Sequence, residues 1–518
     1  MVLITSGAYA SPALVSEFGK LPPSFLPVQN RRLFSHQLKL FDKEHGARFI
    51  SLPKSFQIDE ADRKELEKEG CNIIWVPDDF SLGQSIVYCL GMVASFEEPL
   101  YILHGDTLFE KITSSKDMFS VADPQYEYEW AQVREDENID RNLVFSGFFS
   151  FSSQIQLIRS ITELQYDFIK GLELYARRVS VENMILPSWL DFGLINSYFR
   201  SVSCFTTERA FNSLKASRFS ITKRSRDKRK VLAEAHWLKN IPTEMKHYAP
   251  AVWNEGNGEE DAFYTLEYLY LSSLANLFVF GKNTIPTWKE IIQSCKDFID
   301  EESKILPPDS EDIARKNERL FKEKTRKRLQ QYCDDNDILM TEPMSCNGIC
   351  IPSLKEILDD IEKDINVDTD RFVSLCHGDF CFSNILYDFK SKSIKVLDPR
   401  GIDIDGNETV YGDFRYDVAK LAHSVIGLYD LIIAGRYSCM QTSPYEYEIN
   451  FEEEEKYRQL QEIFTGLKFG GYEIDELNTY PLMIGLFLSM LPLHSDRPDR
   501  QKAMLANALR LYIDYKKI

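Results

Sequence analysis

The apolar pattern of this chain changes once, near residue 210, and that change limits the folds open to it. Up to about residue 200, short strand-like runs alternate with helix-like segments. Beyond residue 215, two strand-like runs are followed by mostly helical sequence with one further strand pair. Alternation favours a parallel, doubly wound α/β sheet, whereas the second pattern is typical of an α+β fold. Because 518 residues also exceed one ordinary hydrophobic core, we expect two domains, at 1–205 and 215–518.

The same periodicity predicts where individual elements lie. In the first domain we expect strands at residues 2–5, 48–52, 72–76 and 100–106, and helices at 33–41 and 82–94. In the second we expect strands at 219–223 and 263–268, helices at 227–238 and 310–333, a strand pair at 383–387 and 393–397, and a connection at 205–217 before them. Ligands bind at the carboxyl ends of parallel strands, where Gly7 and Asp106 are placed.

Net charge and cysteine spacing exclude several classes of function. A net charge of −19 argues against a nucleic-acid partner, because phosphate binding needs clustered Lys and Arg. The ten cysteines lack zinc spacing, since Cys346 and Cys350 have no second pair, and reduced thiols are typical of a cytoplasmic enzyme. The first seven residues resemble a strand rather than a signal peptide, and no apolar run reaches about 18 residues. We expect a cytoplasmic protein without membrane insertion; nothing indicates its oligomeric state.

Three polar residues of the second domain follow apolar runs at informative spacing. Asp379 and Asn384 lie five residues apart after the run 372–376, and a second run, 394–397, ends in Asp398. Phosphoryl transfer from ATP needs a base near the attacking hydroxyl and oxygen ligands for Mg²⁺. We therefore expect Asp379 to accept the proton of a small hydroxyl substrate, and Asn384 and Asp398 to hold the metal.

These residues resemble the motif of the aminoglycoside-phosphotransferase and choline-kinase family, which are small-molecule relatives of protein kinases. The motif is His-Gly-Asp, four residues, Asn, and then a strand that ends in Asp, and all three parts are present at 377–379, Asn384 and Asp398. The resemblance implies a protein-kinase-like α+β fold, with an N-lobe at about 215–285 and a C-lobe at about 286–518. It also implies ATP as phosphoryl donor and Mg²⁺ as cofactor.

The same resemblance assigns roles to residues outside that motif. Lys223 is implied to bind phosphate, Glu234 to be its helix partner, and Glu267 to lie at the hinge that contacts adenine. Asp417 is implied to brace the catalytic loop. Lys228 and Lys230 lie close enough in sequence to be confused with Lys223, and Arg400 could touch substrate or form an ordinary salt bridge. No glycine-rich loop precedes the strand of Lys223.

The first domain resembles sugar-1-phosphate nucleotidyltransferases over residues 1–200. Its matches are the loop at Gly7, the Pro-rich segment 23–28, Gln84 within 81–86, Asp106 within 103–106, the strand 144–148 and the segment 189–191. The resemblance implies that Gly7 and Gln84 bind an NTP such as CTP, that Asp106 and Asp191 bind metal, and that 144–148 lines a sugar site.

Two cations of that family's motif are missing here. The loop 7–10 has no Arg, and Ser24 stands where the family has Lys. Lys20, Arg31 or Arg32 could substitute for them. A degenerate domain that binds a nucleotide or sugar without turnover is the alternative.

Chains that combine both features resemble bifunctional proteins of capsule and surface-polysaccharide biosynthesis. There a kinase could phosphorylate a sugar, polyol or amino alcohol, and the nucleotidyltransferase could then activate the product with an NTP. Two alternatives stay open: a kinase with a first domain used only for binding or assembly, and a non-catalytic pseudoenzyme scaffold. Choline is a rival substrate, because Tyr411, Phe414 and Tyr416 could form an aromatic cage for a cation.

Overall fold

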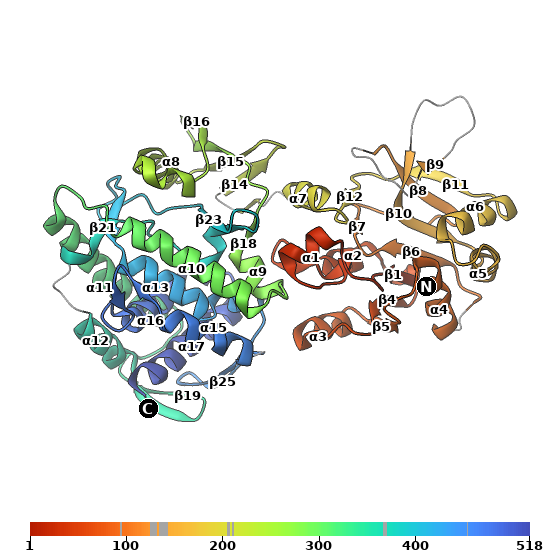
Figure 1. Ribbon diagram of the computed structural model, residues 1–518. Coiled ribbons are helices and arrows are strands. Elements are labelled where there is room, and N and C mark those ends of the chain that lie inside the picture. The colour runs from red at the N-terminus through yellow and green to blue at the C-terminus, as the bar shows by residue number, and fades with distance from the viewer. Residues whose placement is uncertain are drawn as a thin grey trace. The chain divides into compact units, whose positions relative to one another are not determined.

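The computed structural model describes residues 1–93, 96–124, 132–133, 143–204, 208–209, 212–365, 370–452 and 454–517. The chain divides into two compact units, whose elements are labelled in Figure 1. The first comprises Met1–Phe205 with Phe280–Lys282, and the second comprises Thr206–Val279 with Asn283–Ile518. Within the described residues, no helix combines the length and the apolar character needed to cross a membrane.

The first unit alternates strands and helices for most of its length. Its strands are β1 Val2–Thr5, β2 Pro27–Val28, β3 Arg31–Arg32, β4 Arg48–Pro53, β5 Cys71–Val76, β6 Leu100–His104, β7 Thr107–Leu108, β8 Met118–Ala122, β9 Gln132–Val133, β10 Leu143–Phe151, β11 Glu182–Ile185 and β12 Leu190–Asp191. Its helices are α1 Pro12–Phe18, α2 Leu33–Gln37, α3 Glu60–Lys68, α4 Leu82–Val93, α5 Gln154–Glu163, α6 Phe168–Arg178 and α7 Ile195–Ser203. The helix expected at 82–94 is thus observed to Val93, and residue 94 lies outside the described residues.

A mixed sheet forms the centre of the first unit, with the strand order β11-β8-β10-β6-β1-β4-β5. Strands β1, β4, β5 and β6 run parallel, as the alternation predicts. Strand β10, however, runs antiparallel to both β6 and β8, so the expectation of a parallel, doubly wound sheet is wrong for this part. Antiparallel neighbours need no crossover helix, and a count of alternating elements does not fix the direction of such a strand.

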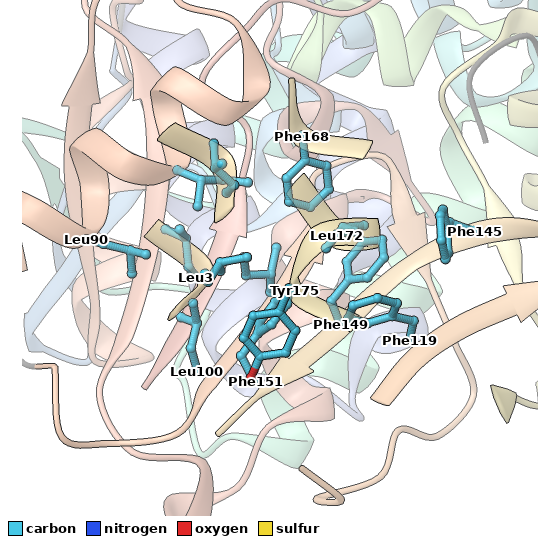
Figure 2. Close-up of a cluster of buried hydrophobic side chains, with 14 of the residues drawn as sticks. Leu3, Leu90, Leu100, Phe119, Phe145, Phe149, Phe151, Phe168, Leu172 and Tyr175 are labelled. Atoms are coloured by element: carbon cyan, nitrogen blue, oxygen red, sulfur yellow. The ribbon is translucent and has the colours of Figure 1, made fainter. Parts of the chain in front are cut away.

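Aromatic side chains fill the core on one face of this sheet (Figure 2). Phe149 of β10 packs edge-on against Phe119 of β8 and Phe168 of α6, with ring centroids 5.6 and 5.5 Å apart. Tyr175 of α6 packs edge-on against Phe151 at 5.1 Å. Edge-to-face packing of this kind is the favoured geometry for aromatic pairs. It holds β10 against β8 and α6, and β10 in turn pairs with β6, the strand that leads to Asp106.

The second unit begins with an antiparallel sheet in the order β13-β14-β15-β17-β16. Its strands are β13 Glu208–Arg209, β14 Asn212–Ala216, β15 Ser220–Ser225, β16 Val252–Asn257 and β17 Ala262–Glu267, and helix α8 Lys228–Asn240 packs on β16 and β17. The expected connection at 205–217 is therefore wrong for β13 and β14, while residues 205–207, 210 and 211 lie outside the described residues. Strand β14 has no regular apolar alternation and pairs along its whole length with β15, so sheet context outweighs its weak strand propensity.

Helices make up most of the rest of this unit. They are α9 Leu274–Phe280, α10 Ile285–Glu302, α11 Ser310–Asp335, α12 Leu354–Asp364, α13 Arg415–Val425, α14 Tyr429–Ala434, α15 Glu454–Thr465, α16 Thr479–Met490 and α17 Pro498–Lys516. Helix α16 packs against α11, α13 and α17 and is almost entirely buried. Helix α11 also packs on the two strands that flank the His377–Asp379 loop.

Several short strands interrupt these helices, where one strand pair was expected. They are β18 Ser272–Ser273, β19 Pro343–Cys346, β20 Ile349–Ser353, β21 Val373–Leu375, β22 Ile385–Asp388, β23 Ser393–Val396, β24 Tyr411–Asp413, β25 Ser438–Ser443, β26 Glu446–Asn450, β27 Lys468–Phe469 and β28 Tyr472–Glu473. The expected pair is β22 and β23, with Ser383 in a 3₁₀ turn before it. The sheet β20-β19-β26-β25 was missed, because β19 pairs with β26 about 100 residues away and local periodicity carries no sign of that.

Candidate active site

The loop that carries Asp379 is held by Asp417, in the first turn of α13. Asp417 accepts hydrogen bonds from the backbone N–H groups of His377 (2.7 Å) and Gly378 (2.8 Å). Gly378 has a φ of 76°, a left-handed conformation that suits glycine. A Cβ atom on Gly378 would also lie only 2.8 Å from the Cβ atom of Arg400. Asp417 therefore braces this loop, as the family resemblance implies.

Asp379 lies between a cation and an amide. The ammonium group of Lys420, on α13, is 2.8 Å from Asp379 Oδ1, and Asn384 Nδ2 donates to Asp379 Oδ2 at 3.1 Å. Burial acts to raise the pKa of Asp379, but the positive charges of Lys420 and Arg400 outweigh it and hold that pKa well below its usual range. The carboxylate is thus ionised and able to accept a proton at neutral pH.

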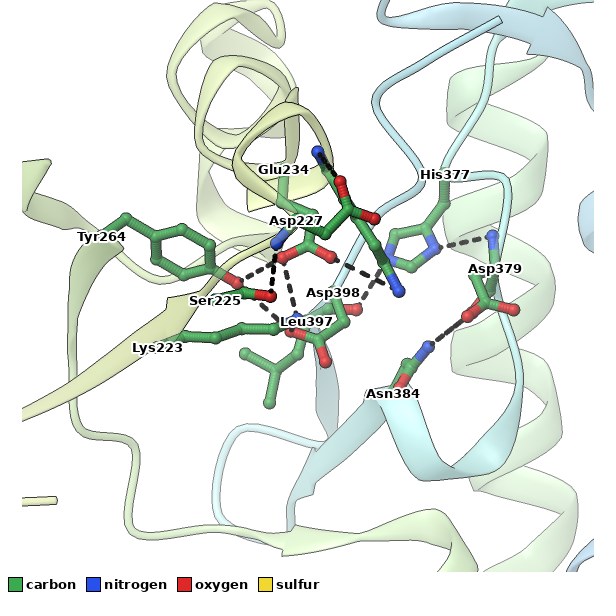
Figure 3. Close-up of polar contacts among 11 residues, drawn as sticks. Lys223, Ser225, Asp227, Glu234, Tyr264, His377, Asp379, Asn384, Leu397 and Asp398 are labelled. Carbon is green, nitrogen blue, oxygen red and sulfur yellow. Dashed lines mark hydrogen bonds and ion pairs between the residues drawn. The ribbon is translucent and has the colours of Figure 1, made fainter. Parts of the chain in front are cut away.

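A second group of charges joins β15, α8 and the end of β23 (Figure 3). Lys223 Nζ lies 2.8 Å from Glu234 Oε2 and 3.0 Å from Asp398 Oδ1, and the Tyr264 hydroxyl donates to the same two oxygens at 3.0 and 3.3 Å. Glu234 is fully buried and Lys223 is nearly so. Burial acts to lower the pKa of Lys223, but Asp398 and Glu234 more than offset it and raise that pKa. Lys223 is therefore a permanent cation held at a fixed place.

His377 and the β22–β23 hairpin connect the two groups. His377 Nδ1 accepts from the backbone N–H of Asp379 (3.3 Å), and Nε2 lies 3.0 Å from the carbonyl oxygen of Leu397. Burial lowers the pKa of His377, which fits a neutral ring that donates from Nε2. The N–H of Leu397 donates to the carbonyl oxygen of Asn384 (2.8 Å). Asn384 and Asp398 therefore both lie at the open end of the β22–β23 hairpin.

The segment that follows Asp398 is fitted closely to helix α8. Gly401 has a φ of 66°, and a Cβ atom there would lie 2.2 Å from the carbonyl oxygen of Ala233 and 3.1 Å from the nitrogen of Glu234. No real side chain tolerates a 2.2 Å contact with backbone. Only glycine therefore allows this segment to lie against the turn of α8 that carries Glu234.

The oxygens at the hairpin end fit the demands of Mg²⁺. Asp398 is 46% exposed, and its Oδ2 has no hydrogen-bond partner among the described residues. Asn384 Oδ1 accepts only a long bond, 3.4 Å, from the Ser383 hydroxyl. A hard cation prefers such oxygens and keeps several water ligands, so two protein ligands suffice. The described residues contain no group of three or more His, Cys, Asp or Glu side chains placed for a metal.

The remaining residues predicted for this site lie further from it. Glu267 ends β17, where its carboxylate accepts from the Ala251 N–H at 3.3 Å, and among the described residues it contacts neither Lys223 nor Asp398. Lys228 donates to carbonyl oxygens of the β16–β17 turn. The Lys230 ammonium is exposed and 4.0 Å from Glu234. Geometry thus singles out Lys223 among the three lysines.

The region around Asp379 carries several positive charges, and three of the cations that provide them had no place in the sequence predictions. Lys420 contacts Asp379 directly, while Lys324 and Arg328 of α11 influence the same region through their charges. The guanidinium of Arg400 lies over the ring of Tyr416, 4.1 Å from its centroid, and forms no salt bridge among the described residues. Spacing of three residues from Asp417 would have placed Lys420 on the loop-facing side of α13.

A cavity of about 190 Å³ opens beside the His377–Asp379 loop, and its lining includes Gly378, Arg400 and Tyr416. Phe414 is buried, and its ring packs edge-on against Phe372. The faces of Tyr416 meet Arg400 and Phe321. Phe414 and Tyr416 are therefore engaged within the protein, and a cation of the protein already lies over the ring of Tyr416, whereas Tyr411 lines the cavity.

In the first unit, Asp106 and Asp191 face one another across Gly193. A Cβ atom on Gly193 would lie 2.7 Å from Asp106 Oδ2 and 3.3 Å from Asp191 Oδ1. Strands β7 and β12 place the two residues by pairing Thr107 with Asp191. Burial and the charge of Asp191 raise the pKa of Asp106 to about 7. Two facing carboxylates of this kind fit a divalent cation.

Gly7 and Gln84 lie near the same edge of the sheet. Gly7 follows β1, and a Cβ atom there would lie 2.9 Å from the hydroxyl of Ser85 in α4. The side-chain oxygen of Gln84 accepts from the N–H of Ser81 (2.8 Å), and the Gln84 N–H donates to the Ser81 hydroxyl (3.3 Å). This reciprocal pair is a helix capping box, so the Gln84 oxygen is used to begin α4.

The cations considered as substitutes in the first unit differ in availability. Arg32 is buried and donates to Asp62 Oδ2 at 2.9 Å and to the carbonyl oxygen of Phe25 at 2.8 Å, so it has a structural role. Lys20 is exposed, and its ammonium lies over the ring of Tyr9, 4.1 Å from the centroid. Lys20 is therefore beside the loop that lacks the Arg.

No family model matches this chain, and no curated protein matches it. Among solved structures, the chain is similar to an aminoglycoside-3'-phosphotransferase of type VIII (15% identity, TM-score 0.31, covering 53% of this chain and 87% of that chain). It is also similar to a thermostable mutant of aminoglycoside phosphotransferase APH(4)-Ia in complex with AMP-PNP and hygromycin B (11%, 0.36, 61% and 94%). A third similar structure is the inositol-1-phosphate CTP transferase from T. maritima (14%, 0.29, 38% and 90%).

Proposed function

We propose that residues 215–518 form a kinase that transfers the γ-phosphoryl group of ATP to a hydroxyl group of a small molecule, with Mg²⁺. One observation carries the proposal. A buried lysine paired with a buried glutamate, an exposed metal-type carboxylate and a separate ionised aspartate are joined through His377 and one hairpin. Phosphoryl transfer needs these groups: a cation for phosphate oxygens, metal ligands and a proton acceptor.

Each group then has a defined task. Lys223, held by Glu234, binds oxygens of the triphosphate, and Asn384 and Asp398 provide ligands for Mg²⁺, which would neutralise charge on the phosphates. The acceptor oxygen attacks the γ-phosphorus, the bond from that phosphorus to the bridging oxygen breaks, and ADP leaves. Asp379 accepts the proton of the hydroxyl. We place Glu267 at the adenine end of the same site.

A substrate screen tests this function. The full-length protein is incubated with MgATP and a panel of sugars, polyols, amino alcohols and choline, and products are identified by mass spectrometry. We expect a phosphorylated product with at least one acceptor and none without Mg²⁺. Glu290→Gln, on the surface of α10, is a matched control for the loss of a carboxylate and should retain full turnover. Lack of any product together with lack of Mg²⁺-dependent ATP binding would support the pseudoenzyme scaffold instead.

A second function, nucleotidyl transfer by residues 1–205, is favoured by the Asp106–Asp191 pair. Its facing carboxylates would hold a divalent cation beside the α-phosphate of CTP or another NTP, with Gly7 leaving room for the nucleotide and Gln84 near its base. Incubation with CTP, UTP and dTTP and the product of the kinase tests it through pyrophosphate release. Absence of pyrophosphate with every NTP would leave the first unit a binding or assembly domain.

Together the two activities would phosphorylate a small hydroxyl compound and then activate it as a nucleoside-diphosphate derivative. Such a product is a cytoplasmic precursor for capsule or surface polysaccharide. The order of the steps is tested by supplying the phosphorylated compound directly, which should bypass a variant that lacks Asp379.

A further inference from the structure

Three cations of the second unit, Lys324, Arg328 and Arg400, act on one another through their charges and form no ion pair among the described residues, and we call them the basic cluster. Lys324 and Arg400 also act on the charge of Asp379. Among the residues that the structure describes, Arg328 donates only to the carbonyl oxygen of Ser489 (3.3 Å), and Arg400 contacts the ring of Tyr416. Lys324 has no ion-pair or hydrogen-bond partner among the described residues. Each member is half-buried rather than free in solvent.

The remaining cations of α11 behave differently. Most of them pair with carboxylates, within the helix or from neighbouring segments: Arg315, Lys316, Arg319, Lys322 and Arg326. Lys327 forms no ion pair among the described residues, but it is exposed to solvent. The chain as a whole has a net charge of −19, so carboxylates are abundant. Carboxylates do lie close to the basic cluster, since Glu362 lines the same hollow as Lys324, but none of them forms an ion pair with Lys324, Arg328 or Arg400 among the described residues.

A half-buried cluster of like charges lowers the stability of the folded protein when no anion is bound to it. Burial, together with the charges of Arg400, Arg328 and Lys420, lowers the pKa of Lys324 to about 7. An anion bound among these groups would supply the missing negative charge and restore the protonated form of Lys324. Strongly perturbed lysines beside a cleft are frequent at functional sites.

The basic cluster is separate from the charges that hold Lys223. The charge of Asp379 acts on Lys324, whereas Lys223 forms ion pairs with Glu234 and Asp398. Arg400 and Tyr416 line the cavity of about 190 Å³ beside Gly378, and Lys324 and Tyr416 line an adjoining hollow. The cavity is smaller than the roughly 300–1,000 Å³ typical of sites for drug-sized ligands, which favours a small acceptor.

From this arrangement we propose that the acceptor of the kinase carries an oxyanion, a phosphate monoester or a carboxylate, which binds to Lys324, Arg328 and Arg400. This substrate class rests on the proposed kinase function. Arginine matches planar and tetrahedral oxyanions through paired N–H donors, and lysine adds a point charge. The same cluster repels choline and amino alcohols, because their ammonium groups would meet three cations. The acceptor hydroxyl, not the oxyanion, is the group that is phosphorylated.

A binding experiment tests the cluster without relying on catalysis. Full-length protein saturated with MgADP is titrated with inorganic phosphate and with acetate by calorimetry. We expect inorganic phosphate to bind, and Lys324→Gln and Arg400→Gln each to weaken its binding at least 10-fold. Lys327→Gln changes an exposed lysine of the same helix and should leave binding unchanged. Unchanged binding in Lys324→Gln, or a loss seen only in Lys223→Met, would show that phosphate binds elsewhere and would overturn the proposal.

Turnover then separates the charge classes of acceptor. Glycerol, glycerol 3-phosphate, glycerate and choline are compared with MgATP, and the pair of anionic compounds distinguishes phosphate from carboxylate. We expect higher kcat/KM for an anionic acceptor, a KM for that acceptor raised at least 10-fold in Lys324→Gln, and an unchanged KM for MgATP. A higher kcat/KM for glycerol or choline than for either anionic compound would refute the proposal that the acceptor carries an oxyanion.

The two proposals fail in different ways. If phosphate binds at Lys324 but no compound of any charge is phosphorylated, the kinase function is wrong and the anion site remains. If phosphorylation occurs and the Lys324→Gln and Lys327→Gln proteins behave alike, the kinase function remains and the oxyanion site is wrong.

Discussion

The polar sites of the two units balance charge in opposite ways. In the second unit Lys223 lies between Glu234 and Asp398, and Asp379 pairs with Lys420, so each charge of the catalytic set has a partner of opposite sign. In the first unit Asp106 and Asp191 face each other. A site whose charges already pair with opposite charges can form before any ligand binds. Two facing carboxylates repel each other until a cation binds between them. We therefore expect the second unit to be ordered without metal and the first to respond strongly to it.

The largest effect should come from removing the proton acceptor. Asp379→Asn keeps the shape of the side chain and the bond with Asn384 but cannot take up the proton, so kcat should fall by about 10³-fold, within the usual range for a general base. Binding of MgATP should stay within about two-fold. Steady-state rates and calorimetry measure these quantities. Normal turnover in this variant would remove Asp379 from the mechanism.

Removing Lys223, the cation that Glu234 and Asp398 share, should have the next largest effect. Lys223→Met leaves the buried Glu234 and Asp398 without their cation, so we expect kcat/KM for MgATP to fall by about 10²-fold, comparable to the loss of one transition-state donor. Loss of one partner of a buried pair should also lower the free energy of unfolding by about 3–5 kcal/mol. Lys230→Met, four residues before Glu234 and exposed, is the matched control and should show neither change.

Binding of a metal ion to the Asp106–Asp191 pair should stabilise the first unit. Wild-type protein should gain about 2.7 kcal/mol of stability in the first unit at a Mg²⁺ concentration 100 times Kd, and Asp106→Asn should gain none. Thermal melting with and without Mg²⁺, followed by a probe in the first unit, measures this. Equal shifts in wild type and variant would place the metal elsewhere.

The same pair gives a pH dependence in the absence of metal. The pKa of Asp106 is raised to about 7 from 3.8, so the folded protein binds this proton more tightly than the unfolded chain does. The resulting stabilisation is complete below about pH 3.8 and is lost as pH rises through about 7. Asp106→Asn imitates the protonated form and should flatten that part of the profile.

The smallest effect concerns the basic cluster of the second unit, where like charges lie together as they do in the Asp106–Asp191 pair of the first. Lys324→Met removes a cation that lies among cations, so we expect the ligand-free protein to be unchanged or more stable by about 1 kcal/mol at neutral pH. Lys327→Met should lie within about 0.5 kcal/mol of wild type. Urea denaturation measures both. A marked destabilisation of Lys324→Met would indicate a structural partner for Lys324.

The residues that could be identified from the sequence are those at strand ends. Asp379, Asn384 and Asp398 follow apolar runs at fixed spacing, and the structure brings them to one loop and one hairpin. Lys420, Lys324 and Arg328 lie on helices about 40 to 55 residues away in sequence, where only the packing of the helix decides which face meets Asp379. Nothing local distinguishes Lys324 from Lys327.

The fold shows the same limit. Strands with strong apolar runs, such as Val2–Thr5 and Leu100–His104, were placed from periodicity. The antiparallel direction of Leu143–Phe151 and the strand Asn212–Ala216 were not, because both depend on which distant strand lies alongside. Apolar periodicity indicates which face of a strand is buried, but it does not indicate which other strand pairs with it.

Gly401 has a consequence for how the second unit tolerates change. Its close approach to Ala233 packs the segment after Asp398 directly on the turn of α8 that carries Glu234, so any side chain at residue 401 would push Asp398 and Glu234 apart. A saturation scan should therefore rank Gly401 among the least replaceable positions. Because its side chain is only a hydrogen atom, Gly401 sets how closely the segment that carries Asp398 can approach helix α8.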